Sequence, residues 1–121
     1  MIAFVVACAG GFGSICRFLL DSVVGQHTHG KIPLGTIAIN VLGSFLLGVI
    51  TGWWTGHGGD PALRLALGLG FCGGFTTFST ACVETARLAR ADGNTIALVH
   101  SMGMLAASVL AAFGGMALGH L

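Results

Sequence analysis

Four ionisable side chains lie inside or beside long apolar stretches of this sequence: Arg17, Glu84, Arg87 and His100. Within lipid such a side chain faces the protein interior, pairs with another polar group or extends its charged end to the interface. Arg17 and Glu84 could form an embedded pair or lie in a water-filled vestibule, and Glu84 alone could serve a proton-coupled substrate site. For Arg17 and Arg87, extension to the interface is the competing interpretation.

A second candidate is a stripe of small and polar residues that recurs every four positions, as residues on one helix face do. It comprises Thr36, Asn40, Ser44, Gly48 and Gly52. Close packing of two helices explains Ser44, Gly48 and Gly52. Asn40 needs a partner for its amide, which either lines a pathway or bonds another helix, and the sequence leaves both open.

The strongest chemical signal is the run GGFTTFST at residues 73–80, in the middle of a long apolar segment. Glycine and hydroxyl residues weaken a continuous helix, and backbone groups freed within a membrane need protein, water or an ion as partners. Exposed carbonyls can hold a cation, and exposed amides favour an anion. The positive ring edges of Phe75 and Phe78 would also attract a small anion. A simple glycine kink is the alternative.

The elements that must position these residues are membrane-spanning helices. Hydrophobic residues make up 55% of the 121 positions and charged residues 7%, which is too little polar surface for a soluble globule. A span needs roughly 20 apolar residues. The sequence predicts one domain, residues 1–121, with spans at 2–20, 34–54, 62–90 and 95–118 and both termini on one side of the membrane.

Several classes of function are disfavoured. The net charge of +1 comes with no basic run, so nucleic acid is not an expected partner. The four cysteines lie in apolar stretches without metal-ligand spacing and are interpreted as packing residues. No catalytic triad, metal cluster or phosphate loop is recognisable, so we predict a non-enzyme. No internal repeat is found either, and a two-fold arrangement would need a second chain.

Three segments together resemble the CrcB/Fluc family of fluoride channels over nearly the whole chain. They are residues 10–17 (GGFGSICR), 35–40 (GTIAIN) and 70–80 (GFCGGFTTFST). The third is highly specific, and the first two gain weight from their order and spacing.

The resemblance implies an all-α membrane protein whose third helix is broken at its centre and which forms an antiparallel, dual-topology dimer. Two pores would export fluoride passively from the cytoplasm, across the inner or plasma membrane of a bacterium. A structural Na⁺ ion would be held at the dimer centre by the backbone carbonyls of Gly73 and Thr76 from both chains.

The resemblance also implies roles for individual side chains. Asn40 would be the pore asparagine, with Thr36 near it, and Phe78 would be the first of two pore phenylalanines. Arg17 and Glu84 would lie toward the pore ends. Hydroxyl donors complete the expected fluoride pathway at Thr80 and Ser108.

Two departures from the family pattern suggest an alternative. The second phenylalanine of a TTFSTF run is replaced by Ala81, and His100 and Met104 occupy expected polar positions of the fourth span, where Ser108 remains. This chain could therefore be a non-conducting or single-pore subunit of a heterodimeric channel.

The distribution of basic residues agrees with that alternative. One side of the predicted topology carries four basic residues and the other carries one, a bias that disfavours dual orientation. The four are Arg17, Lys31, Arg87 and Arg90, against Arg64. A less favoured alternative is a small proton-coupled multidrug transporter built on Glu84, because Trp53 and Trp54 lie at a helix end rather than around that carboxylate.

Overall fold

The computed structural model describes residues 1–121, and all its regular elements are helices. Four segments are long and apolar enough to cross a membrane, as predicted: α1, α2, the composite segment Pro61–Asp92, and α6. The elements are α1 (Ile2–His27), α2 (Leu34–His57), α3 (Pro61–Leu65), the π-helix η1 (Ala66–Cys72), α4 (Gly73–Phe75), α5 (Ser79–Asp92) and α6 (Asn94–His120).

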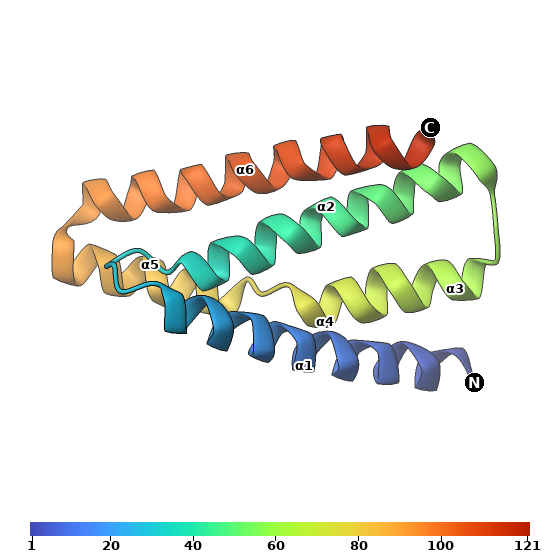
Figure 1. Ribbon diagram of the computed structural model, residues 1–121, viewed down its shortest axis with the longest axis horizontal. Helices are drawn as coiled ribbons and strands as arrows, with labels where there is room; N and C mark the ends of the chain where they lie inside the picture. Colours follow the sequence, from blue (N-terminus) through green and yellow to red (C-terminus); the bar gives the residue numbers. More distant parts are fainter.

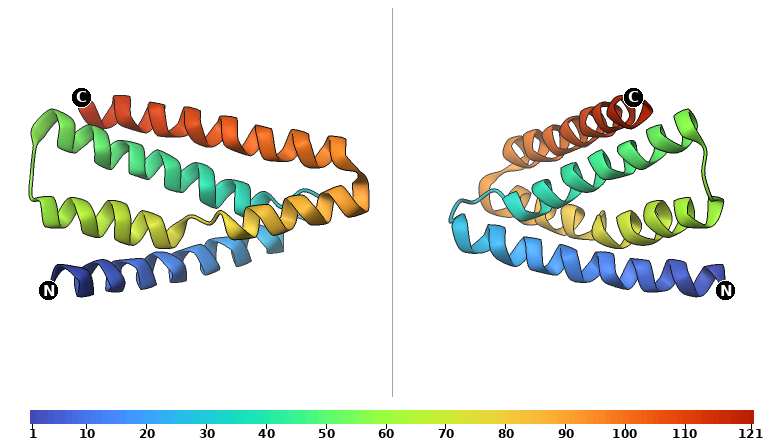
Figure 2. Two further views of the ribbon diagram at one scale, coloured as in Figure 1. Left: turned by 180° about the vertical axis from the view of Figure 1, so that it is seen from behind. Right: turned by 45° about the vertical axis from the view of Figure 1, so that its right-hand side comes forward.

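The four segments run side by side along the long axis of the molecule (Figure 1). Both termini lie at one end together with the α2–α3 connection, and the α1–α2 and α5–α6 connections lie at the other (Figures 1 and 2). Helix α2 packs along α6, α1 packs on η1 and α4, and α5 packs on α6. Only 18 of the 121 residues are buried, so most apolar side chains face outward, as they do in a lipid solvent.

The helices extend past the apolar stretches that define them in the sequence. Helix α1 was expected to end at position 20 and continues to His27. Its added turns are supported by side chains that bond the carbonyl four residues earlier: Ser22 Oγ donates to Phe18 O at 2.8 Å, and His27 Nδ1 lies 2.8 Å from Val23 O. Polarity therefore marks the interface here, not the end of the helix.

The close approach of α2 and α6 depends on glycine, which confirms the packing interpretation of Gly48 and Gly52. A Cβ atom on Gly48 would meet Ala112 O, and one on Gly52 would meet Met116 O. From the other helix, Gly115 and Gly119 face the α2 backbone in the same way. The two backbones are thus in direct contact over several turns.

A single ion pair closes the end of the bundle that carries both helical connections. Lys31 Nζ lies 2.8 Å from Asp92 Oδ1, which joins the α1–α2 linker to the last turn of α5. The hydrogen bond that Lys31 donates to Asp92, and secondarily the negative charge of Asp92, raise the pKa of Lys31 above its usual value. Lys31 lies between two of the apolar segments and Asp92 is the last residue of the third, so the pair lies at the expected membrane surface.

The composite segment Pro61–Asp92 changes its backbone twice near its middle. The π-helix η1 widens the helix over seven residues and gives way to the single turn of α4. Thr76 then has extended backbone with ψ 160°, and α5 begins only at Ser79. Three residues, Thr76 to Phe78, thus lie between helices near the middle of this segment.

Candidate functional site

Two side chains of α1 bind the backbone carbonyls next to this non-helical stretch. Ser14 Oγ donates to Gly74 O at 3.2 Å as well as to Gly10 O in its own helix at 3.0 Å. One turn further, Arg17 Nη1 donates to Thr76 O at 3.2 Å. Glycine at position 74 allows this contact, because a Cβ atom there would meet Gly10 O. Helix α1 thus supplies donors to carbonyls that have lost their helical partners.

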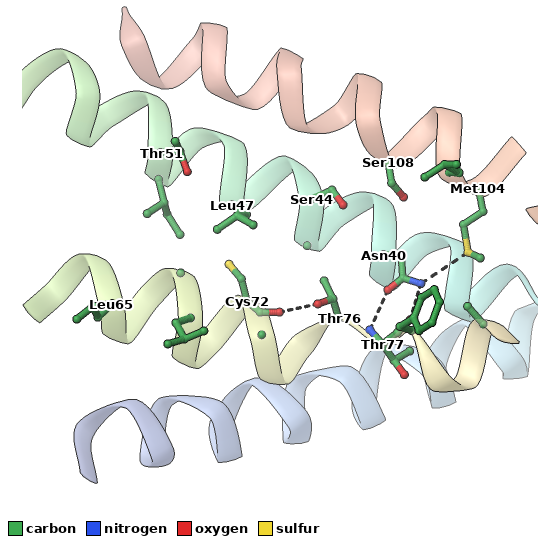
Figure 3. A pocket seen from close by; sticks show the side chains of 18 of the residues that line it. Asn40, Ser44, Leu47, Thr51, Leu65, Cys72, Thr76, Thr77, Met104 and Ser108 are labelled. Carbon is green, nitrogen blue, oxygen red and sulfur yellow. Dashed lines mark hydrogen bonds between the residues drawn. The ribbon is translucent and has the colours of Figure 1, made fainter. Parts of the chain in front are cut away.

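From the opposite side, Asn40 of α2 binds both backbone groups of Thr77. Asn40 Oδ1 accepts from Thr77 N and Asn40 Nδ2 donates to Thr77 O, each at 2.9 Å (Figure 3). The second N–H of the Asn40 amide faces Met104 Sδ of α6 at 3.6 Å. The thioether is a weak acceptor, so this N–H is the least firmly bound donor of the site.

The side chain of Thr77 organises the start of α5. Its Oγ1 accepts from Thr80 N at 3.3 Å and donates to Thr80 Oγ1 at 3.1 Å, in the place of a helix cap. Thr77 itself is buried. The diverted Thr77 N–H leaves the carbonyl of Gly73, four residues earlier, without its helical donor.

A pocket of about 950 Å³ opens beside these contacts, between α2, the α3–α4 segment and α6 (Figure 3). We call it the central pocket. Its wall mixes apolar side chains with a row of amide and hydroxyl groups, and Arg64 is the charged member of the lining. The polar groups are Asn40, Ser44, Thr51, Thr76, Thr77, Ser101 and Ser108.

The predicted site residues divide into those that line the central pocket and those that do not. Asn40, Gly73, Thr76, Phe78, Ala81 and Ser108 line it. Phe78 is 85% exposed, so its ring projects from the single chain. Thr36 is buried outside the pocket lining, and Thr80 is exposed and bound to Thr77.

Arg17 and Glu84 do not form the embedded ion pair that the sequence left open. The ion pair that the chain contains is Lys31–Asp92, Arg17 binds the Thr76 carbonyl, and Glu84 Oε2 is buried without a hydrogen-bond partner. The pairing hypothesis is wrong for this chain, because the Arg17 guanidinium donates instead to a backbone carbonyl of the stretch after α4.

Sequence reasoning missed Thr77 and underrated Ser14 and Met104. Thr77 lies in the TTFST run, but its role comes from its backbone, for which side-chain type gives no signal. Ser14 lies in the segment GGFGSICR, where its hydroxyl could have indicated a bond to a neighbouring backbone carbonyl.

A metal site would have to use backbone oxygen. No group of three or more His, Cys, Asp or Glu side chains could hold a metal ion. The Gly73 carbonyl, which lacks its helical donor, suits a hard cation, while the Thr76 carbonyl already faces the positive Arg17 guanidinium. One chain therefore offers a partial fit to the Na⁺ site that the sequence suggested.

These features define a multi-pass helical membrane protein with a polar pocket beside an interrupted helix. Comparison with known proteins is specific. The model of the family described as "CrcB-like protein, Camphor Resistance (CrcB)" matches residues 4–120, nearly the whole chain. The chain belongs to this family.

Relatives from several organisms match over similar lengths. The "Fluoride-specific ion channel FluC 2" of Cutibacterium acnes is 54% identical over 115 residues, 94% of either chain. The "Fluoride-specific ion channel FluC 1" of Leifsonia xyli subsp. xyli is 46% identical over 121 residues, covering 100% of this chain and 88% of its own. The "Fluoride-specific ion channel FluC" of Methanopyrus kandleri is 40% identical over 117 residues, 95% of this chain and 86% of its own.

Proposed function

We propose that this protein is a fluoride-selective channel that lets fluoride leave the cytoplasm passively, with pores formed where two antiparallel chains meet. The observation that carries the proposal is the row of amide and hydroxyl donors along the central pocket, centred on Asn40, in a chain whose relatives are named fluoride-specific ion channels. The cell membrane is the proposed location.

The mechanism follows from the chemistry of the pocket. Fluoride holds water tightly, so a pore must replace that water with donors in steps. The Asn40 N–H that faces Met104 Sδ can turn to an anion at small cost, because it gives up only a weak acceptor. The hydroxyls of Ser44 and Ser108 offer further donors along the same wall. The edge of Phe78 would attract the ion without holding it.

The dimer is proposed because the pocket of a single chain is open to the side. A polar wall that faced lipid would be costly, and an antiparallel second copy would cover it. The exposed Phe78 ring would then reach the partner chain. A Na⁺ ion at the dimer centre would supply positive charge to the Gly73 and Thr76 carbonyls of both chains.

Ion efflux from liposomes tests the function directly. Vesicles that contain the purified chain should release fluoride rapidly and chloride hardly at all. Asn40→Asp should slow fluoride release at least about tenfold, because the carboxylate repels the anion and cannot donate to Thr77 O. The matched control is Asn94→Asp, at the exposed start of α6. Equal fluoride release from wild type and Asn40→Asp would refute the assignment of Asn40.

A second candidate is that this chain is a single-pore or non-conducting subunit that pairs with a homologous chain. Ala81 favours it, because Ala81 lines the central pocket where the family pattern has a ring. The test is the chain purified alone. A stable dimer that conducts fluoride removes the need for a partner, whereas release of neither ion favours the subunit role.

A further inference from the structure

His100 of α6 is a buried ionisable group that the proposed pathway does not use. It is 6% exposed, and both of its ring nitrogens are buried without a hydrogen-bond partner. A neutral imidazole carries one hydrogen-bond donor and one acceptor, and both lack a partner here. Within a membrane-spanning helix no bulk water reaches them, and polar groups of this kind usually serve a function.

Glu84 of α5 is the matching group on the neighbouring helix. Its Oε2 is also buried without a partner. It lies on the same helix face as Ala81 and Leu88, both buried, just as His100 lies one turn from the buried Ala97. Measured from the connecting Gly93, Glu84 lies about 13 Å along α5 and His100 about 10 Å along α6. The two side chains therefore enter the interior at nearly the same depth.

The remaining titratable groups on the elements packed against α6 do not face His100. On α2 the single such group is His57, exposed at the opposite end of the bundle. On α5 the others are exposed, and Asp92 binds Lys31. These α5 groups are Cys82, Arg87, Arg90 and Asp92. Glu84, which is half-buried with a buried Oε2, is thus the acid available to His100, although no ion pair within 4.0 Å joins them.

His100 is also close to the central pocket in the helix register. Ser101, its neighbour, and Met104, one turn on, both line the pocket. Met104 Sδ in turn meets the Asn40 amide. A change of charge at His100 would therefore be felt along the proposed fluoride path, across a medium that screens it poorly.

We propose that Glu84 and His100 form one buried proton-binding site whose occupancy sets the rate of fluoride conduction. The proposal rests on the function proposed above. Without an added proton the two groups carry a charge of minus one, with one proton they are neutral overall, and with two they carry plus one. Each proton bound makes the path more attractive to an anion. Conduction therefore rises as pH falls and the site gains protons.

Efflux as a function of pH tests this directly. Fluoride release from vesicles clamped with a potassium ionophore is measured between about pH 8.5 and about pH 5.5. Protein-free vesicles give the background from hydrogen fluoride, which crosses lipid unaided. Wild type should gain roughly tenfold across this range. His100→Gln and Glu84→Gln should each flatten the profile, while His120→Gln, exposed at the other end of α6, should retain it.

A spectroscopic titration separates this site from the channel function. The ¹⁵N resonances of His100 should move with pH in wild type, and their midpoint should shift in Glu84→Gln. A flat efflux profile in wild type, an unchanged profile in His100→Gln, or a His100 resonance that does not titrate would overturn the proton site. If wild type releases no fluoride at any pH, the channel proposal fails, and the resonance titration still decides whether the two groups share protons.

Discussion

Individual polar side chains do for the interrupted segment what helical hydrogen bonds do elsewhere. Ser14 and Arg17 bind carbonyls from one side, and Asn40 binds the N–H and C=O of Thr77 from the other. Each replaces a backbone partner that the interruption removed. The conformation of these residues therefore depends on side chains of two other helices and is sensitive to single substitutions.

Replacing Arg17 with leucine should destabilise the protein measurably. The substitution removes a charged donor and leaves the part-buried Thr76 carbonyl without it, at a cost of about 1.5 to 3 kcal/mol. The thermal unfolding midpoint in detergent reports the change. Arg90→Leu, on the exposed face of α5, is the control and should be close to neutral. Equal midpoints for the two variants would contradict the structural role of Arg17.

Ala81→Phe should increase the fluoride release rate, because it adds a second aromatic edge at a position that lines the central pocket. Initial rates of fluoride efflux from matched liposomes measure the effect, with an expected gain of at least a fewfold. Ala86→Phe places the same ring on an exposed position of α5 and should change nothing. Because Ala81 is buried, the comparison uses only protein whose thermal unfolding midpoint matches that of wild type. A gain from Ala86→Phe, or none from such an Ala81→Phe protein, would exclude a missing ring as the limitation.

At this scale the sequence identified the right residues more readily than their partners. Asn40 stood out because an amide in a membrane span needs hydrogen-bond partners, and it does bond another segment of the chain, the non-helical stretch between α4 and α5. Its partner, the Thr77 backbone, could not be predicted, since it depends on how α2 meets the residues after α4. Whether Asn40 also lines a pathway stays a prediction for the efflux experiment.

Among the elements, α2 and α6 pack backbone to backbone through glycines on both helices. The composite third segment packs against α1. The apolar lengths predicted both helices of the pair, and the four-residue spacing predicted the packing face of α2. The π-helix η1, which packs against α1, was not predictable, because no residue type in ALGLGFC distinguishes its wider hydrogen bonding from that of an α-helix. The helix ends differed because side-chain bonds to the backbone continue α1 beyond its apolar core.

Two neighbouring glycines of α6 should respond oppositely to alanine. A Cβ atom on Gly115 would collide with Phe45 O and crowd Val49 N, so Gly115→Ala should destabilise by about 1 to 3 kcal/mol. A Cβ atom on Gly114 meets nothing within 4 Å. Gly114→Ala should therefore be neutral or stabilise by up to about 1 kcal/mol through helix propensity. Chemical or thermal unfolding of both variants checks the contrast, and equal effects would mean that α2 and α6 are not in backbone contact.

For the whole molecule, charge is distributed unevenly between the two ends of the bundle. Lys31, Arg87 and Arg90 lie toward the end with the α1–α2 and α5–α6 connections, and Arg64 lies toward the end with the termini. The number of basic residues at each end could be counted from the sequence, because four membrane crossings determine which connections lie on the same side. The ion pair of Lys31 with Asp92 was not, since it joins residues 61 positions apart.

The bias supports the second candidate function, in which the antiparallel partner is a homologous chain and not a second copy. In that case it predicts a preferred orientation with the Lys31 end in the cytoplasm and the C-terminus outside. Alkaline phosphatase fused to the C-terminus should be active, and a fluorescent protein fused there should be dark. The double variant Lys31→Gln, Arg90→Gln removes two basic residues from that end, so part of the protein should insert in the opposite orientation. Both reporters should then give a signal. Similar activity of both reporters on the wild-type chain would instead establish dual topology and favour a homodimer.

The position of both termini at one end of the bundle has a consequence for genetic fusion (Figure 1). Two copies joined by a short flexible linker would be forced to insert in the same orientation, whereas an additional membrane-crossing helix between them would invert the second copy. A tandem gene with such a connecting helix would encode an antiparallel pair in one polypeptide. In that format Ala81→Phe or Asn40→Asp can be placed in one half only, so that each pore can be read separately.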